Sequence, residues 1–323
     1  MAEPATHRVL VTGGNGFVGR EVTRLLCDGH AVCVLDNLRS GPLRLGRCTR
    51  DRLTLAEIDI ADAAAVARLM TEFAPDIIIH LAAIHYIPEC EENPSLAVQT
   101  NVHGTVNLLA HAPEGARFVF ASSGAVYQPD DKPHVEATAT VAPTDVYGFS
   151  KLHGEHYVRY FAQQRKLSAV IVRLFNVVGP GETNPHLLPE IVAQLKAGHR
   201  TLRLGNMWPK RDYIHVVDAA RGFIAVALKA GIAPGSTQTV NLGTSQTYSV
   251  AEIVEKLKQI TANGFALEQE QVRLRKVDRP FLAADITEIR ARFGWTPQAS
   301  IDDALADLWR EPDLAPALMA KYR

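Results

Sequence analysis

Short apolar runs alternate with longer stretches of helical periodicity along the first 175 residues of this chain. The runs that predict strands span residues 9–12, 31–35, 53–58, 77–79, 118–121 and 170–174. Helical spacing predicts one helix over 16–27, a second over 62–73 with Asp62 as its cap, and a long third helix from about Tyr147. This alternation predicts an α/β fold in which helices cover a parallel sheet.

The pattern loosens after residue 175. Glycines and prolines punctuate residues 179–189, a helix is expected up to about residue 198, and strand-like pieces occur near Leu202 and Val240. We expect residues 1–175 to form the main domain, to which the chain returns around 213–244, and residues 176–323 to form mainly a smaller C-terminal substrate lobe. Ligands of such sheets bind beyond the carboxyl ends of the strands.

Composition and charge narrow the classes of partner. The net charge is −1, with 34 basic and 35 acidic side chains, and no long basic run is present, so a nucleic-acid partner is not expected. No apolar run is long enough for a membrane span, and the polar start of the chain does not resemble an export signal, which predicts a cytoplasmic protein. The four cysteines and the histidines lack metal-ligand spacing, so we expect reduced thiols and no metal site.

A glycine-rich loop follows the first predicted strand. Residues 9–19 read VLVTGGNGFVG, in which Gly13, Gly16 and Gly19 allow a tight turn and let backbone N–H groups approach a pyrophosphate. Asp36 ends the next strand, where a carboxylate binds a ribose 2′-hydroxyl and repels a 2′-phosphate. These features predict a Rossmann-type doubly wound sheet that binds NAD rather than NADP. Arg39, three residues after Asp36, would weaken the preference for NAD over NADP. Alternatively, Asp36 has no role in cofactor binding and is only a turn residue at the end of a strand.

Tyr147 and Lys151 lie four residues apart, so a helix places them on one face. A phenol has an ordinary pKa of about 10, and the charge of Lys151, together with a positive nicotinamide ring, would lower that pKa. Tyr147 would then exchange a proton with a substrate hydroxyl while the carbon that bears this hydroxyl exchanges hydride with the nicotinamide. Ser123 follows the strand 118–121, within reach of the same oxygen. The alternative is a surface pair of no catalytic importance.

Further motifs occur in a fixed order after the glycine loop and Asp36. They are HLAA (80–83), SSGAVY (122–127), YGFSK (147–151), RLFNVVGP (173–180) and RDYIHVVDAA (211–220). In this order they resemble the extended short-chain dehydrogenase/reductase family of nucleotide-sugar epimerases, dehydratases and reductases. The resemblance implies NAD as cofactor, a nucleoside-diphosphate sugar as substrate, and a homodimer formed through the helices around 101–111 and 147–164.

The resemblance also implies roles for individual residues. The catalytic residues would be Ser123, Tyr147 and Lys151. The cofactor-binding residues would be Gly13, Gly16, Phe17, Val18, Gly19, Asp36, Asn37, Asp59, Ile60, Leu81, Ala82, Ala83, Asn101 and Lys151. The substrate-binding residues would be His85, Ser123, Tyr147, Asn176, Arg211, Arg275 and Asp278.

Some of these residues also allow other interpretations. The forked guanidinium groups of Arg211 and Arg275 suit a diphosphate. The alternatives are a surface ion pair of Arg211 with Asp212 and a solvated charge run around Arg275. His85 is either a partner of a substrate oxygen or an ordinary loop histidine.

The residues after Ser123 restrict the types of reaction that the resemblance allows. Dehydratases of the family carry an acidic residue there, whereas this chain has Gly124 and Ala125, which argues against a dehydratase. A 4-epimerase that oxidises and re-reduces one carbon with bound NAD is favoured by the SSGAVY motif. A 4-keto-sugar reductase using NADH or NADPH remains the alternative, since LGNMWPKR (204–211) resembles the loop of GDP-sugar dehydratases and reductases. A catalytically silent nucleotide-sugar sensor is the alternative of another class.

Overall fold

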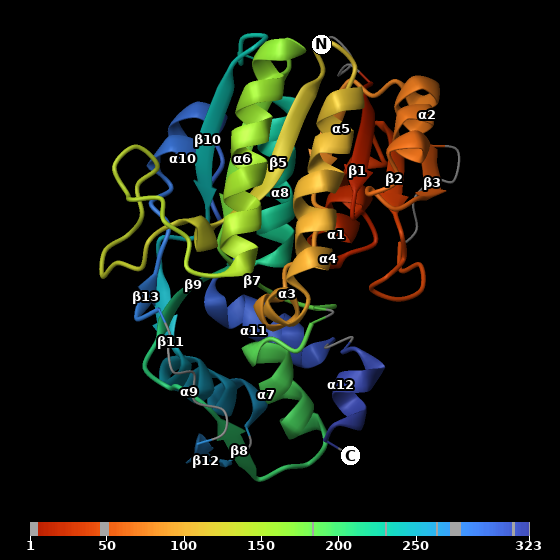
Figure 1. Ribbon diagram of the computed structural model, residues 1–323. Coiled ribbons are helices and arrows are strands. Elements are labelled where there is room, and N and C mark those ends of the chain that lie inside the picture. The colour runs from red at the N-terminus through yellow and green to blue at the C-terminus, as the bar shows by residue number, and fades with distance from the viewer. Residues whose placement is uncertain are drawn as a thin grey trace.

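The central feature of the molecule is a parallel sheet. The computed structural model describes residues 6–45, 52–182, 184–229, 231–262, 264–271, 279–311 and 314–322. In this part of the chain the main sheet has seven strands in the order β10-β6-β5-β4-β1-β2-β3, all parallel (Figure 1). The strands are β1 (Arg8–Thr12), β2 (Ala31–Asp36), β3 (Leu53–Glu57), β4 (Ile77–His80), β5 (Arg117–Ser123), β6 (Ser168–Leu174) and β10 (Thr237–Leu242). The predicted α/β class with a doubly wound parallel sheet is confirmed.

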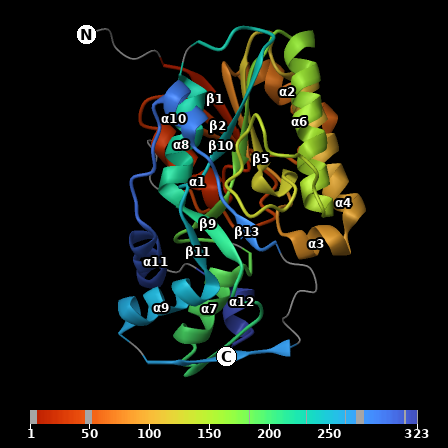
Figure 2. The same cartoon turned by 90° about the vertical axis from the view of Figure 1, so that its left-hand side faces the viewer.

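Helices cover both faces of this sheet (Figure 2). One layer consists of α1 (Phe17–Leu26), α8 (Val216–Leu228) and α10 (Thr287–Phe293), and the other of α2 (Ala63–Phe73), α5 (Thr105–His111) and α6 (Val146–Gln164). Successive strand residues point to opposite faces. Val9 and Val11 therefore pack toward the first layer, while Leu10 packs toward the second.

Side-chain caps fix where two of these helices begin. Asp62 accepts a hydrogen bond from the backbone of Ala65, so the predicted cap of α2 is confirmed. Asp145 accepts a hydrogen bond of 2.7 Å from the backbone of Gly148 and thereby starts α6. A capping carboxylate satisfies a free N–H group of the first turn. The cap at Asp145 places Tyr147 in the first turn of α6.

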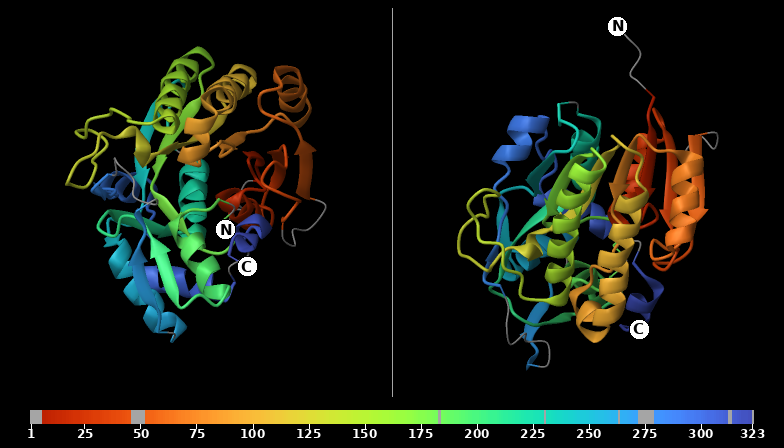
Figure 3. Two further views of the ribbon diagram at one scale, coloured as in Figure 1. Left: turned by 60° about the horizontal axis from the view of Figure 1, so that its bottom comes forward. Right: turned by 45° about the horizontal axis from the view of Figure 1, so that its top comes forward.

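A smaller lobe lies beyond one end of the sheet (Figure 3). Its apolar core joins α7 (Leu187–Lys196), β8 (Thr201–Leu204), α9 (Val250–Thr261) and α11 (Ile301–Arg310). The remaining lobe elements are β12 (Ala266–Gln269), which pairs with β8, and α12 (Pro316–Ala320), which contacts α7.

A second small sheet connects the lobe to the main sheet. Its central strand is β9, which pairs with the other three. The strands are β7 (Asn176–Val178), β9 (Lys210–His215), β11 (Thr247–Ser249) and β13 (Phe281–Leu282). After β9 the chain returns to the main sheet through α8 and β10, and β10 pairs with β6.

The chain between β4 and β5 forms a series of short helical elements before α5. They are α3 (Ile87–Glu92), α4 (Pro94–Val98) and the π-helical segment η2 (Gln99–Gly104). β5 is followed by a short 3-10 turn, η3 (Gly124–Val126). None of the helices described has both the length and the apolar character needed to cross a membrane.

The cysteines differ in their bonding. Cys33 and Cys90 are buried free thiols, whereas Cys27 is disulfide-bonded. The expectation of reduced thiols is therefore wrong for Cys27, because spacing along a chain does not reveal which cysteines meet after folding.

Candidate active site

A cavity of about 1060 Å³ opens between the sheet and the smaller lobe. Its walls come from the loops that follow β1, β2, β4 and β5 on one side and from β7, α7 and β9 on the other. This is the carboxyl end of the sheet, where ligands of doubly wound folds bind.

The glycine loop forms one end of the cavity and leaves no room for larger side chains. Gly13 has a φ of +68°, and a Cβ atom there would lie 2.7 Å from the backbone nitrogen of Ala82. A Cβ atom on Gly19 would lie only 1.9 Å from the carbonyl oxygen of Gly13. No side chain caps α1 at Gly16, so the N–H groups of its first turn remain available. The loop therefore fits a bound pyrophosphate.

Asp36 ends β2 and lines the same part of the cavity. Its carboxylate accepts hydrogen bonds of 2.9 Å from the backbone of Asn15 and 2.8 Å from that of Leu38. It thus orders the turn while it also lines the cavity beside the glycine loop. Arg39, which we expected to soften the preference for NAD, pairs with Glu89.

Almost all the cofactor-binding residues expected from the sequence line this cavity. They are Gly13, Gly16, Phe17, Val18, Gly19, Asp36, Asn37, Asp59, Ile60, Leu81, Ala82, Ala83 and Lys151. Asn101 is the exception, since it is buried behind the wall and 1% exposed. It hydrogen-bonds both backbone groups of Ile84, at 2.8 and 2.9 Å, and Ser150 Oγ at 3.0 Å. Asn101 therefore links the loop after β4 to α6 through its side-chain hydrogen bonds.

Ser123, Tyr147 and Lys151 all line the cavity, and both Ser123 and Lys151 lie beside the Tyr147 ring. The Ser123 side chain hydrogen-bonds that of Tyr147 and also accepts a bond of 3.1 Å from the backbone of Ala125. Lys151 Nζ donates to the carbonyl of Ala121 at 2.8 Å. Ser123 is presented by the end of β5, and the other two residues are presented by the first turns of α6.

The pKa of Tyr147 is shifted in the direction opposite to the one expected from the sequence. Burial raises the pKa of Tyr147, although the hydrogen bond from Ser123 opposes the change. Burial also lowers the pKa of Lys151 to about 8. We expected Lys151 together with a nicotinamide ring to lower the pKa of Tyr147; in the protein alone, the loss of water around the phenol outweighs the hydrogen bond from Ser123 and the pKa is raised. Ionisation of Tyr147 therefore needs a further positive charge beside it.

A buried ion pair lies behind the catalytic helix. Glu155 is fully buried and bonds Arg173 through two hydrogen bonds of 2.8 Å, while Ser122 donates to it at 2.7 Å. Burial by itself raises the pKa of Glu155, but Arg173 outweighs it and the pKa is lowered overall. Because Ser122 and Arg173 come from β5 and β6, this network fixes α6 against the sheet.

The expected substrate residues reach the cavity from both sides. Asn176 on β7 and Arg211 on β9 line it from the lobe, and His85 lines it from the loop after β4. Arg211 donates a hydrogen bond of 2.8 Å to the carbonyl of Arg279. Arg275 and Asp278 lie outside the described residues.

Several charged or titratable residues of the cavity were not predicted from the sequence, among them Arg279, Glu182 and His186. Arg279 donates to the carbonyls of Tyr127 and Ala125 at 2.8 and 2.9 Å, so it braces η3 beside Ser123. Glu182 and His186 lie next to His85. None of the family motifs named above marks them, and the partners of Arg279 and the histidine beside Glu182 and His186, His85, come from distant parts of the chain.

Comparison with known proteins identifies the family. The model of the NAD dependent epimerase/dehydratase family matches residues 9–243. The chain belongs to this family. Among its curated relatives, UDP-glucose 4-epimerase of Corynebacterium glutamicum is 32% identical over 94% of each chain. The human UDP-glucose 4-epimerase is also 32% identical, over 94% of this chain and 96% of the relative.

Solved structures of family members agree with the fold. UDP-glucose 4-epimerase from Brucella ovis in complex with NAD has a TM-score of 0.83 and 30% identity, over 97% of this chain and 99% of that one. The enzyme from Bifidobacterium longum in complex with NAD⁺ and UDP has a TM-score of 0.83 and 28% identity, over 95% and 99%. The family predicted from the sequence motifs is thereby confirmed.

Proposed function

We propose that this protein is an NAD-dependent nucleoside-diphosphate-sugar 4-epimerase that acts on a UDP-sugar. The observation that carries the proposal is the meeting of Ser123, Tyr147 and Lys151 in one cavity with the glycine loop. The relatives named above are UDP-glucose 4-epimerases, and solved relatives hold NAD or UDP. The sequence left the base open, and these relatives support uridine.

Side chains of this chain provide the acid and base of the reaction. Bound NAD⁺ would accept and return the hydride, and its positive charge would favour the phenolate form of Tyr147. As a phenolate, Tyr147 would take the proton of the sugar 4-hydroxyl, hold it on the phenol oxygen, and return it when the other face of the carbon is reduced. Ser123 hydrogen-bonds Tyr147 and orients the same oxygen. The amide of Asn176 and the guanidinium of Arg211 face the diphosphate from the lobe.

The structure offers no acid where a dehydratase needs one. Gly124 and Ala125 follow Ser123 in the buried turn η3 and carry no acidic group. The 4-keto-sugar reductase would use the same residues as the epimerase, and the silent sensor would use the same cavity. The relatives favour the epimerase over both.

A stoichiometric assay tests the proposal. Purified protein is incubated with UDP-, GDP-, CDP- and dTDP-sugars, with and without NADH, and the products are identified by NMR. The epimerase interconverts two UDP-sugars without net consumption of NADH. Consumption of one NADH per product would instead establish a reductase, and no turnover of any nucleotide sugar would support the sensor.

We also propose that the protein is a homodimer formed through α5 and α6. Exposed aromatic side chains on α6 support this, since Phe149, Tyr157 and Tyr160 are 50%, 42% and 58% exposed. Such residues are enriched in interfaces. Sedimentation measurements should give twice the mass of the chain, and Tyr160→Glu should shift the protein toward the monomer. A monomeric wild-type protein would contradict the proposal.

Two predictions from the sequence remain proposals. The first assigns NAD binding to residues 1–175, with a return around 213–244, and substrate binding mainly to residues 176–323. The second places the protein in the cytoplasm.

A further inference from the structure

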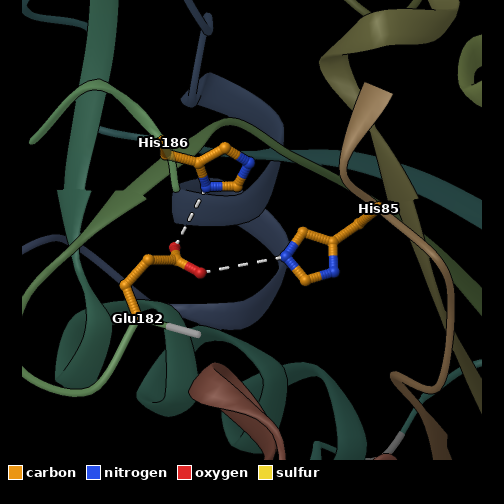
Figure 4. Close-up of side chains that lie close together, drawn as sticks. All are labelled: His85, Glu182 and His186. Carbon is orange, nitrogen blue, oxygen red and sulfur yellow. Dashed lines mark ion pairs between the residues drawn. The ribbon is translucent and has the colours of Figure 1, made fainter. Parts of the chain in front are cut away.

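Three potential metal ligands meet on the wall of the cavity. They are His85, from the loop after β4, and Glu182 and His186, from the segment between β7 and α7. Glu182 Oε2 lies 3.3 Å from His186 Nδ1, and Glu182 Oε1 lies 4.0 Å from His85 Nε2. Figure 4 shows both imidazole rings turned toward the carboxylate of Glu182. One ligand atom from each residue lies within 4.8 Å of the other two.

The surroundings of these side chains favour a cation. Glu182 is only 5% exposed, and its two carboxylate oxygens are directed at the two imidazole rings. The His85 ring also hydrogen-bonds the backbone of Ala83. Metal-bound histidines are held in this way, with the second ring nitrogen fixed by a carbonyl or carboxylate.

Asn184 also contacts the cluster of His85, Glu182 and His186. Its side-chain nitrogen lies 3.0 Å from His85 Nε2, and its backbone nitrogen donates to Glu182 Oε1 at 3.2 Å. The residue therefore supports the cluster through contacts with both His85 and Glu182.

We propose that His85, Glu182 and His186 bind a divalent transition-metal ion, with Zn²⁺ as the best match. Imidazole nitrogen and carboxylate oxygen suit Zn²⁺, and metal–ligand distances of about 2.0–2.2 Å place tetrahedral ligand atoms about 3.4 Å apart. The pair of Glu182 and His186 already has this separation, at 3.3 Å. All three ligand atoms lie within 4.8 Å of one another, so the His85 side chain would have to move closer when an ion binds.

The ligand set resembles that of catalytic rather than structural zinc sites. Structural sites are closed by four protein ligands, whereas two histidines and one glutamate leave a position open. Here all three ligands line the substrate cavity, so a water molecule or a substrate oxygen would occupy that position. The ion would also link the sheet side of the cavity to the lobe. This inference concerns metal binding and does not depend on which sugar reaction the protein catalyses.

Metal titration of the full chain, without an affinity tag and after dialysis against a chelator, tests the site. Isothermal titration with Zn²⁺ should show one ion per chain, and Co²⁺ should give the visible absorption of a four-coordinate site. Glu182→Gln and His186→Ala should each weaken Zn²⁺ binding at least about tenfold, because each removes one of three ligands. His199→Ala is the matched control, since His199 belongs to the same lobe but does not line the cavity.

Two results would overturn the proposal. One is a wild-type protein that binds neither Zn²⁺ nor Co²⁺, in which case the three residues form only a hydrogen-bonded cluster. The other is equal Zn²⁺ affinity in the wild type and both ligand variants, which would place the ion elsewhere. NAD binding, measured by fluorescence, should persist in all variants and shows that they are folded, so a failed metal site leaves the epimerase proposal untouched.

Discussion

The ammonium of Lys151 lies 5.8 Å from the centre of the Tyr147 ring, one turn further along α6. Despite this neighbour, burial keeps the pKa of Tyr147 above its ordinary value. The phenol thus retains its proton in the protein alone and depends on additional positive charge to release it. This relationship makes Tyr147 the most direct target for a functional test.

Tyr147→Phe should reduce turnover of the nucleotide sugar by a factor of about 10²–10⁴, the usual contribution of a general acid or base. Binding of NAD should persist, because the glycine loop and Asp36 are unchanged. The measurement combines steady-state turnover with a fluorescence titration of NAD(H). Tyr157→Phe, on the exposed side of the same helix, is the control and should retain full activity. Undiminished turnover in Tyr147→Phe would remove this residue from the mechanism.

Gly19→Ala should disrupt the glycine loop. The new Cβ atom would lie 1.9 Å from the carbonyl oxygen of Gly13, so the backbone must shift. We expect a loss of about 1–3 kcal/mol in the free energy of unfolding and a large loss of NAD affinity. Gly29→Ala is the matched control, because no atom lies within 4 Å of its Cβ position. Urea unfolding and NAD titration compare the two variants, and equal behaviour would contradict the steric argument.

Glu155→Ala should strongly destabilise the protein. It leaves Arg173, which is 4% exposed, without its charged partner. Removing one member of a buried ion pair costs about 3–5 kcal/mol in the free energy of unfolding. The exposed pair of Glu268 and Arg203 provides the control, since Glu268→Ala should cost at most about 1 kcal/mol. Chemical unfolding of both variants checks the difference, and similar losses would show that the buried network carries little stability.

His80 should make the protein sensitive to acid. Its ring is buried, and its nitrogens lie 2.7 Å from Thr12 Oγ1 and 2.8 Å from Thr105 Oγ1. Thr105 donates its own proton to Asn101, so it accepts from Nε2 of a neutral imidazole. Burial, reinforced by Lys151, lowers the pKa of His80 from 6.5 to about 3.

The sign of this effect follows from proton binding. Between pH 6.5 and about 3 the unfolded chain binds the proton and the folded chain does not, so stability falls as the pH falls through this window. The loss approaches about 1.4 kcal/mol per pH unit for one histidine. Urea unfolding at several pH values should give a flatter dependence for His80→Asn than for the wild type. His156→Asn, which alters an exposed histidine of α6, should leave the wild-type slope unchanged.

The chain's local patterns were sufficient to predict the α/β class, the glycine loop, and the order of the six strands and three of the helices up to residue 174. These features depend on residues close together in the sequence: apolar periodicity sets β1 and α1, Asp62 caps the helix that directly follows it, and Tyr147 and Lys151 share a face because they are four residues apart. The family motifs added the substrate class, which local physics alone does not contain.

Tertiary structure decided what distant segments do together. It brought His85 beside Glu182 and His186, placed Asn101 behind the cavity wall rather than along it, and joined Glu155 to Arg173 beneath α6. It also set the direction of the Tyr147 pKa shift, since desolvation depends on how completely other elements enclose the phenol. Sequence spacing reports the neighbours along one helix or strand, whereas burial and cross-lobe contacts arise only when the separate elements pack against one another.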